Sequence, residues 1–353
     1  MRRIAFLTCA IALITSATAG AQSDTRSWAH PQIATVVAAG LLAPSTADFR
    51  PQEPLTRSEL AVALSSLGAV DVDVDQPDRA VSLRELDARL VTLVGLRPEA
   101  RTIRLAAASA GLGPPAWLGT ETVARILGLR VNHPTGVEQL ELQLYEPATR
   151  AEAAYSLARI LALRDDEVEE VRSVVAAFRL PEVTVQQRAV LSRALRLVGS
   201  PYVWAGASER TQQIGGRSVP GGFDCSGFVW RVYKLQSFDF APNLGRVLEG
   251  RTSFAMSGEI SPAARIGRSD LQPGDVVFFG PNGTRSKPSQ VGHMGIYVGS
   301  GWFVHSSTNG TTMQPLTGWH DRTFAWARRP LAEAGVASSP LRLTAGGGVP
   351  KQA

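Results

Sequence analysis

One cysteine in this chain lies in a pattern that suits nucleophilic chemistry. The sequence has two cysteines, Cys9 and Cys225. Cys9 lies in a leader-like stretch that we expect to be removed, which leaves Cys225 alone. A single thiol can form neither an internal disulfide nor a multi-cysteine zinc site. It is therefore either an inert buried thiol or a nucleophile, and Asp224 before it is a typical N-cap residue, which places Cys225 at a helix start.

A helix start would make this thiol reactive. A thiolate there faces the positive end of the helix dipole and free amide donors, which lower the thiol pKa. The same amides could stabilise an oxyanion on a substrate carbonyl. Residues that pack the rest of the helix inward follow at helical spacing: Phe228, Val229, Val232 and Tyr233. We therefore expect a reactive thiol at the end of a helix that the core holds in place.

A nucleophilic thiol needs a base, and the sequence offers two histidines on a predicted β-hairpin. The chain has five histidines, His30, His133, His293, His305 and His320. Residues 291–298 alternate as a strand, 299–301 have the composition of a three-residue hairpin loop, and 302–305 form the return strand. His293 and His305 therefore fall on neighbouring strands.

The register of this hairpin decides whether the two histidines meet. If Val298 pairs with Trp302, His305 lies opposite Gly295, and His293 is one diagonal step away on the same face. Diagonal neighbours are about 7–8 Å apart, within reach of two imidazoles. A two-residue loop would shift the register by one residue and put the histidines on opposite faces. The predicted Cys-His-His triad thus depends on the loop length.

Each of these residues alone has an ordinary structural explanation. A lone buried cysteine is usually inert, and a strand histidine usually has a structural role. The combination is more specific: D-C-S-G-F at a helix start, G-H-M-G-I-Y-V-G on a strand, and a third polar residue on the next strand. The combination favours a catalytic site.

These segments resemble the NlpC/P60 family of cell-wall cysteine peptidases. The resemblance covers about residues 185–330 and rests on the segments 201–204, 223–229, 251–253, 271–279, 292–299 and 304–307. It implies an α+β, papain-like fold with helices against a small antiparallel sheet. The sequence departs from the family at Ala205, where a glycine is usual. A long loop at 206–222 could shape the access of substrate.

The resemblance also implies a role for each site residue. Cys225 would be the nucleophile, His293 the base and His305 the residue that orients the base. On the substrate side, Tyr202 matches the tyrosine near the oxyanion site, and Asp224 and Ser226 match positions that contact the substrate peptide. No metal and no cofactor is implied.

Two N-terminal segments repeat the pattern P-x-T-R-x-E-x-A, at residues 54–61 and 147–154. Thr56 with Glu59, and Thr149 with Glu152, fit the capping box that begins a helix. Residues 82–85 form a third predicted capping box. Repeated helix starts of this kind indicate repeated helical units that bury a shared core.

This region resembles the S-layer homology domain, well at residues 27–67 and moderately at 117–161, with a degenerate unit between them. The resemblance implies an all-α region that binds an anionic secondary polymer of the cell wall. Arg57 and Arg150 would contact the polymer. The alternative is that both are ordinary arginines on capped helices.

The remaining features set the domain plan. Residues 1–21 read as a signal peptide, with Arg2 and Arg3 before an apolar run that is too short to span a bilayer. We expect a helical wall-binding region at 27–163, a linker helix at 164–184, the peptidase domain at 185–330 and a disordered tail at 331–353. No later segment is apolar enough for a transmembrane helix. Removing the leader lowers the net charge from +5 to +3, and an exported chain of so small a charge is a poor nucleic-acid binder.

The sequence therefore predicts a secreted, envelope-associated hydrolase. By the resemblance, its substrate is the peptide stem of peptidoglycan, cut between γ-D-glutamyl and a diamino acid. Two alternatives stay open. One is another enzyme on the same fold, an N-acetylmuramoyl-L-alanine amidase or a wall acyltransferase. The other is a wall-binding protein without catalytic activity.

Overall fold

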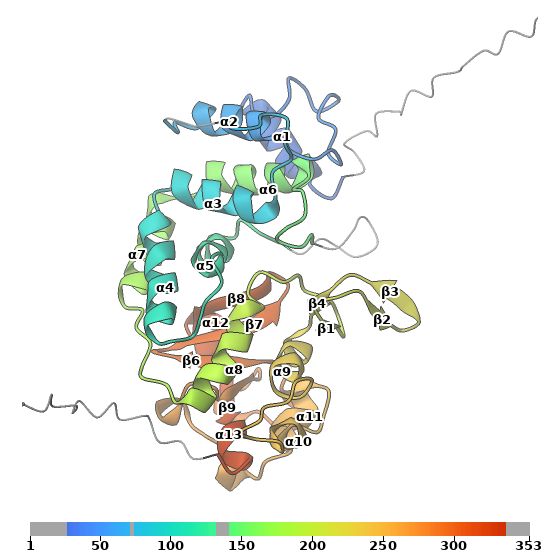
Figure 1. Ribbon diagram of the computed structural model, residues 1–353. Coiled ribbons are helices and arrows are strands. Elements are labelled where there is room, and N and C mark those ends of the chain that lie inside the picture. The colour runs from blue at the N-terminus through green and yellow to red at the C-terminus, as the bar shows by residue number, and fades with distance from the viewer. Residues whose placement is uncertain (1–26, 71–73, 132–140, 337–353) are drawn as a thin grey trace, which may run out of the picture.

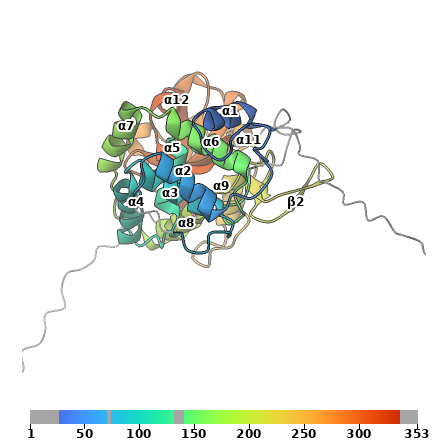
Figure 2. The ribbon, with the colours of Figure 1, turned by 90° about the horizontal axis from the view of Figure 1, so that it is seen from above.

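The computed structural model describes residues 27–70, 74–131 and 141–336 (Figure 1). The predicted signal peptide and most of the predicted tail lie outside these residues. Within them, no helix combines the length and the apolar character that crossing a membrane requires. Helices form the N-terminal half, and a sheet flanked by helices forms the C-terminal half (Figures 1 and 2).

The N-terminal half consists of helices. Their bounds are α1 His30–Ala38, α2 Arg57–Ser66, α3 Leu83–Leu93, α4 Arg97–Ser109, α5 Leu118–Ile126, α6 Arg150–Leu161 and α7 Asp165–Ala176. Three of them, α2, α3 and α6, begin where the capping patterns predict. Thr56 and Glu59 form both contacts of the capping box, and Thr149 accepts from the Glu152 amide. Ser82 makes no side-chain cap bond, so the third capping box is wrong in its contacts, although a helix does begin there.

The three helix starts meet one another. Isolated antiparallel bridges join Pro54 to Thr149, Thr56 to Ala80 and Ser82 to Pro147. Each start therefore contacts the other two, so the degenerate middle stretch packs as a third unit. The starts need one another to pair their backbone groups.

The C-terminal half begins with α8 Val185–Arg196 and contains the predicted antiparallel sheet. Its other elements are β1 Ala207–Ser208, β2 Gln212–Ile214, β3 Arg217–Val219, β4 Gly222–Phe223, α9 Cys225–Tyr233, α10 Leu244–Val247, α11 Ser253–Gly258, β5 Val276–Phe279, β6 His293–Gly299, β7 Trp302–Ser307, β8 Gly310–Pro315, α12 Gly318–Thr323, β9 Phe324–Arg328 and α13 Pro330–Glu333. The sheet order is β8-β7-β6-β5-β9, with every pair antiparallel. The predicted α+β class is confirmed.

The two faces of the sheet pack against different helices. Alternate residues such as Met294, Ile296 and Val304 join the main core, to which α9 contributes Phe228 and Val229. The opposite face carries a smaller core that includes Phe279 and Phe303, and α12 lies against it. The long loop 206–222 forms the short strands β1–β4, and the β2–β3 hairpin projects from the body (Figures 1 and 2).

The β6–β7 hairpin reaches the predicted register by a different route. The loop has two residues, Ser300 and Gly301, both with positive φ, as a two-residue hairpin turn requires. The register shifts between Tyr297 and Gly299, so a bulge compensates for the shorter loop. The predicted three-residue loop is therefore wrong, but Tyr297 still pairs with Phe303.

The helical half and the sheet share one hydrophobic core. The predicted linker helix, α7, buries Val171 and Val175, and Phe178 after it packs edge-on against Trp302 of β7 at 4.9 Å between ring centroids. The Trp117 indole donates to the Val198 carbonyl at 3.1 Å. The N-terminal half is thus packed onto the C-terminal half as one body.

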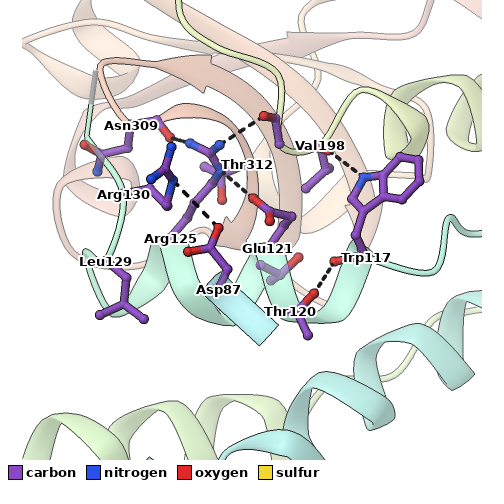
Figure 3. Close-up of polar contacts among 12 residues, drawn as sticks. Asp87, Trp117, Thr120, Glu121, Arg125, Leu129, Arg130, Val198, Asn309 and Thr312 are labelled. Atoms are coloured by element: carbon purple, nitrogen blue, oxygen red, sulfur yellow. Dashed lines mark hydrogen bonds and ion pairs between the residues drawn. The ribbon is translucent and has the colours of Figure 1, made fainter. Parts of the chain in front are cut away.

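A buried charge cluster lies at this junction (Figure 3). Arg125 of α5 donates to the Gly199 carbonyl at 3.0 Å and also to the Asn309 carbonyl in the turn between β7 and β8. Its counter-charges are Glu121 at 3.4 Å and Glu141 at 3.0 Å. A single guanidinium therefore connects a helix of the N-terminal half to two loops of the C-terminal half.

The cluster holds more carboxyl groups than guanidinium groups. Arg130 adds contacts to Asp87, Glu141 and Glu152. Burial raises the pKa of Asp87 well above its usual range, and burial raises the pKa of Glu121. A raised pKa favours the neutral, protonated form of each acid, which lessens the excess negative charge of the cluster.

Candidate active site

The start of α9 places the predicted nucleophile as the sequence indicates. Cys225 is the first residue of α9, and the Asp224 carboxylate accepts from the Gly227 amide at 2.5 Å and the Ser226 hydroxyl at 2.9 Å. Gly227 is required here, because a Cβ would lie 1.8 Å from the Gly206 carbonyl oxygen. The cap and the close packing of this turn fix the position of the thiol.

Arg251 supports the same turn, although the sequence marks it only as part of the segment 251–253. It pairs with Asp224 at 3.2 Å and donates to the Ser226 hydroxyl at 2.7 Å. It also donates to the Ala205 carbonyl at 2.8 Å. Ala205 has φ +61°, a left-handed conformation that explains why glycine suits this position.

Cys225 lies in a cleft of about 600 Å³ that also contains the other predicted substrate-side residues. The lining includes Tyr202, Asp224, Ser226, His293 and Arg251. Burial, with the charges of Cys225 and Asp224, raises the pKa of the Tyr202 hydroxyl to about 12. Tyr202 is therefore a neutral hydroxyl that can donate a hydrogen bond in the cleft.

The two predicted histidines meet on one face of the sheet. His293 Nε2 and His305 Nδ1 are 2.8 Å apart. His305 is 1% exposed and stacks on Phe303 with ring centroids 4.5 Å apart. Gly295 leaves room for it, because a Cβ there would lie 3.0 Å from the His305 Cβ. His305 makes its hydrogen bond to Nε2 of His293. Nδ1 of His293 is therefore available to a group in the cleft.

The pKa of the Cys225 thiol is raised, whereas the sequence predicts that it is lowered. Burial and the Asp224 charge raise the pKa of the Cys225 thiol to about 11, against the opposing effect of the Met294, Ser226 and Cys225 amides. Burial and the neighbouring His320 lower the pKa of His293 to about 3. At neutral pH the free site therefore holds a thiol and a neutral imidazole, because the cost of burying the charges exceeds the effect of the helix start.

A third histidine, His320, also belongs to this site, and the sequence alone does not indicate that it lies there. It lies on α12, with its ring centroid 5.1 Å from that of His305 and 6.0 Å from that of His293. Burial lowers its pKa to about 4. No spacing in the sequence reveals this contact, because a separate helix brings His320 over the sheet.

Among the described residues, these three imidazoles form a group that could hold a metal ion, with one nitrogen of each within 4.8 Å of the others. Two nitrogens bound to one tetrahedral zinc at about 2.0–2.1 Å would be roughly 3.3 Å apart. The His293–His305 separation of 2.8 Å is shorter and is that of a hydrogen bond. The arrangement fits proton transfer and orientation better than metal ligation.

The two predicted polymer contacts differ in exposure. Arg150 is 1% exposed and donates to the carbonyls of Phe49 and Leu42 and to Glu59. These bonds tie one helix start to another, so Arg150 has a structural role and does not face a polymer. Arg57 is partly exposed and pairs with Glu85 at 3.0 Å.

Comparison with known proteins gives matches in both halves of the chain. Residues 199–328 match the NlpC/P60 family model, and residues 23–61 match the S-layer homology domain. The murein DD-endopeptidase MepH of Escherichia coli is 34% identical over 145 residues, which are 40% of this chain and 45% of that protein. The γ-D-glutamyl-L-lysine dipeptidyl-peptidase of Bacillus subtilis is 23% identical over 58% of this chain and 64% of that protein.

A solved NlpC/P60 family protein from Bacillus cereus is 26% identical, over 44% of this chain and 43% of that one, with a TM-score of 0.32. The matches thus span less than two thirds of each of these relatives. The family match spans every residue that lines the cleft, Cys225 and His293 among them, and it also includes His305. Residues 199–328 are therefore similar to the NlpC/P60 family, and a segment similar to the S-layer homology domain precedes them.

Proposed function

We propose that this protein is a secreted peptidoglycan hydrolase that cleaves stem-peptide amide bonds by a Cys-His-His mechanism. The observation that carries the proposal is the cleft with Cys225 at a helix start and His293 held by buried His305. Cys225 is the nucleophile, His293 the base and His305 the orienting residue. The matches to murein and γ-D-glutamyl peptidases support peptidoglycan as the substrate class.

The neutral resting state defines the first chemical step. The thiol passes its proton to Nδ1 of His293 as the sulfur attacks the scissile carbonyl, which forms a tetrahedral oxyanion. The oxyanion lies near the Cys225 amide and the Tyr202 hydroxyl, which donate to it. His305 accepts from His293 Nε2 and stabilises the imidazolium.

The remaining steps return the site to its starting state. His293 gives its proton to the leaving amine, the C–N bond breaks, and the acyl group remains on Cys225 as a thioester. Neutral His293 then takes a proton from water, whose oxygen attacks the thioester. Collapse releases the acid product and returns the proton to the sulfur.

We further propose that the bond cleaved joins γ-D-glutamyl to a diamino acid. The test is digestion of defined stem peptides that carry muramic acid, followed by mass analysis of the products. We expect a muramoyl-L-alanyl-D-glutamate fragment with a free γ-carboxyl group, and a peptide with a free diamino-acid amine. Muramic acid freed of its whole peptide would instead assign an N-acetylmuramoyl-L-alanine amidase, and a product extended by an added amine would assign an acyltransferase.

The N-terminal half is proposed to hold the enzyme at the envelope. Arg57 is the remaining candidate contact for an anionic wall polymer, since it is partly exposed whereas Arg150 is buried. Arg57→Ala should reduce retention on purified walls several-fold at low salt. At high salt the variant should differ little from the native protein, because salt screens the attraction between exposed charges. Arg164→Ala, at the exposed N-cap position before α7, is the matched control. Equal retention of the two variants would show that Arg57 does not bind the polymer and is an ordinary arginine at a helix start.

A further inference from the structure

The hydrogen bonding that starts at His293 continues beyond His305. If His293 Nδ1 receives the thiol proton, neutral His293 carries its own proton on Nε2 and donates it to His305 Nδ1. Neutral His305 then carries its proton on Nε2. This nitrogen is fully buried and has no hydrogen-bond partner of good geometry in the described part of the chain. A buried donor of this kind needs an acceptor to keep its tautomer.

Gln314 is the group placed to supply that acceptor. On β8 it pairs with Phe303, while His305 pairs with Thr312. Gln314 is therefore the diagonal neighbour of His305 on the same face of the sheet, within reach of its ring. Its side chain also raises the pKa of His305, against the larger lowering by burial. A group that favours protonated His305 acts on it as an acceptor.

The other end of the Gln314 amide is fixed by His320. Gln314 Nε2 lies 3.0 Å from His320 Nδ1. An amide nitrogen can only donate, so Nδ1 of His320 accepts and the amide oxygen is left for His305. His320 is held over this position by contacts of its ring with Phe303 and Phe279.

We propose that Gln314 and His320 are positioning residues that extend the catalytic pair into a chain of donors with one direction, from His293 through His305 and Gln314 to His320. His320 sets the orientation of the Gln314 amide, the amide oxygen sets the tautomer of His305, and His305 sets the tautomer of His293. The proposal rests on the proposed function of Cys225, His293 and His305.

The far end of this chain reaches a second cavity, of about 290 Å³, at the junction with the N-terminal half. Gln314 and His320 line it, together with the charged residues Arg125, Arg159, Glu167 and Glu170. Arg125 and Arg159 are both ion-paired, to Glu141 and Glu167 respectively. The chain of donors thus runs from the catalytic cleft to the surface where the two halves pack.

The first test compares Gln314→Glu with Gln314→Met on the full-length protein. Glutamate keeps an acceptor for His305, whereas methionine keeps only the volume. We expect Gln314→Met to lower kcat by about 10- to 100-fold with little change in KM, and Gln314→Glu to keep more of kcat and to raise the apparent pKa of the acid limb of the pH–rate profile. A packing role would give the opposite order, because a buried carboxylate is costlier than a thioether, and that order would overturn the proposal.

His320→Gln and His320→Phe supply the matched pair at the end of the chain. Glutamine can still accept from the Gln314 amide, and phenylalanine cannot. We expect His320→Gln to retain more of kcat than His320→Phe. Gln52→Met, at an exposed position of the N-terminal half, is the control for the substitution chemistry. Equal kcat values for the two His320 variants would show that His320 is not part of the chain of donors.

The second test does not need a substrate. In protein labelled with ¹⁵N-histidine, the ring-nitrogen shifts of His305 report which nitrogen carries the proton. We expect the Nε2–H tautomer in the native protein and a mixture of tautomers in Gln314→Met. An Nδ1–H tautomer in the native protein, or no change in the variant, would refute the chain of donors. If the native protein cleaves no stem peptide while these shifts are as expected, the proposed function fails and the chain of donors stands.

Discussion

Replacing His305 with phenylalanine lowers kcat for stem-peptide cleavage by about 10³-fold and leaves KM nearly unchanged. Phenylalanine keeps the stacked ring against Phe303 but offers no acceptor to His293 Nε2. The proton of His293 then moves freely between its two nitrogens, and the imidazolium formed in the first step loses its partner. Loss of the orienting member of a triad reduces kcat by about 10⁴ in the best-studied case, and a neutral orienting group should contribute somewhat less.

The measurement is steady-state kinetics on one defined stem peptide across a range of pH. His305→Asn should recover part of kcat, since an amide oxygen can accept from His293. His30→Phe, at an exposed position on α1, serves as the control. A His305→Phe enzyme with native kcat would show that His293 needs no orienting residue.

Replacing Arg125 with methionine lowers the free energy of unfolding by about 3–5 kcal/mol. Methionine fills a similar volume but leaves the Glu121 and Glu141 carboxyls without this counter-charge in the interior. Removal of one partner from a buried ion pair costs about that much. The carbonyls of Gly199 and Asn309 lose their donor as well.

Urea unfolding at several pH values checks this result. Buried carboxyls without a counter-charge take up protons, so the loss should shrink as the pH falls toward about 4, near the pKa of unfolded carboxyl groups. Arg164→Met removes two ion pairs of an exposed arginine, with Asp166 and Glu167, and should cost less than about 1 kcal/mol. If Arg125→Met also lowered the free energy of unfolding by less than about 1 kcal/mol, the cluster would not hold the two halves together.

Local patterns in the sequence predict the parts of the site that depend on neighbouring residues. The Asp224 cap and the Thr56–Glu59 capping box each join residues three positions apart, so spacing alone determines them. The hairpin register is predicted for a different reason. Two-fold alternation requires His293 and the core residues to keep their faces, and the bulge before Gly299 preserves this alternation despite the shorter loop.

Features that depend on long-range packing could not be predicted in the same way. Arg57 and Arg150 have the same local motif, yet only Arg150 points into the core, where Glu59 from another repeat accepts its bond. His320 comes to the site on α12, and the raised pKa of Cys225 results from burial by distant segments. Local spacing contains no information on which face of a helix meets a neighbour.

The contacts at the junction suggest a second role for the N-terminal half, besides the proposed binding to the cell wall. Arg125 binds the Asn309 carbonyl, and Thr308, the residue before Asn309, lines the catalytic cleft. The helical half therefore supports one wall of the cleft through a fixed contact. The sequence predicts a linker helix at 164–184 between the two regions, but it does not predict this contact.

The central claim is that Cys225 cleaves a stem-peptide amide bond as a nucleophile, and the most direct measurement compares the native protein with Cys225→Ala on the defined muramoyl peptide by mass analysis. We predict cleavage at the γ-D-glutamyl bond by the native protein and a loss of at least about 10³-fold in Cys225→Ala, with unfolding midpoints that match. Cleavage at the native rate by Cys225→Ala would contradict the claim.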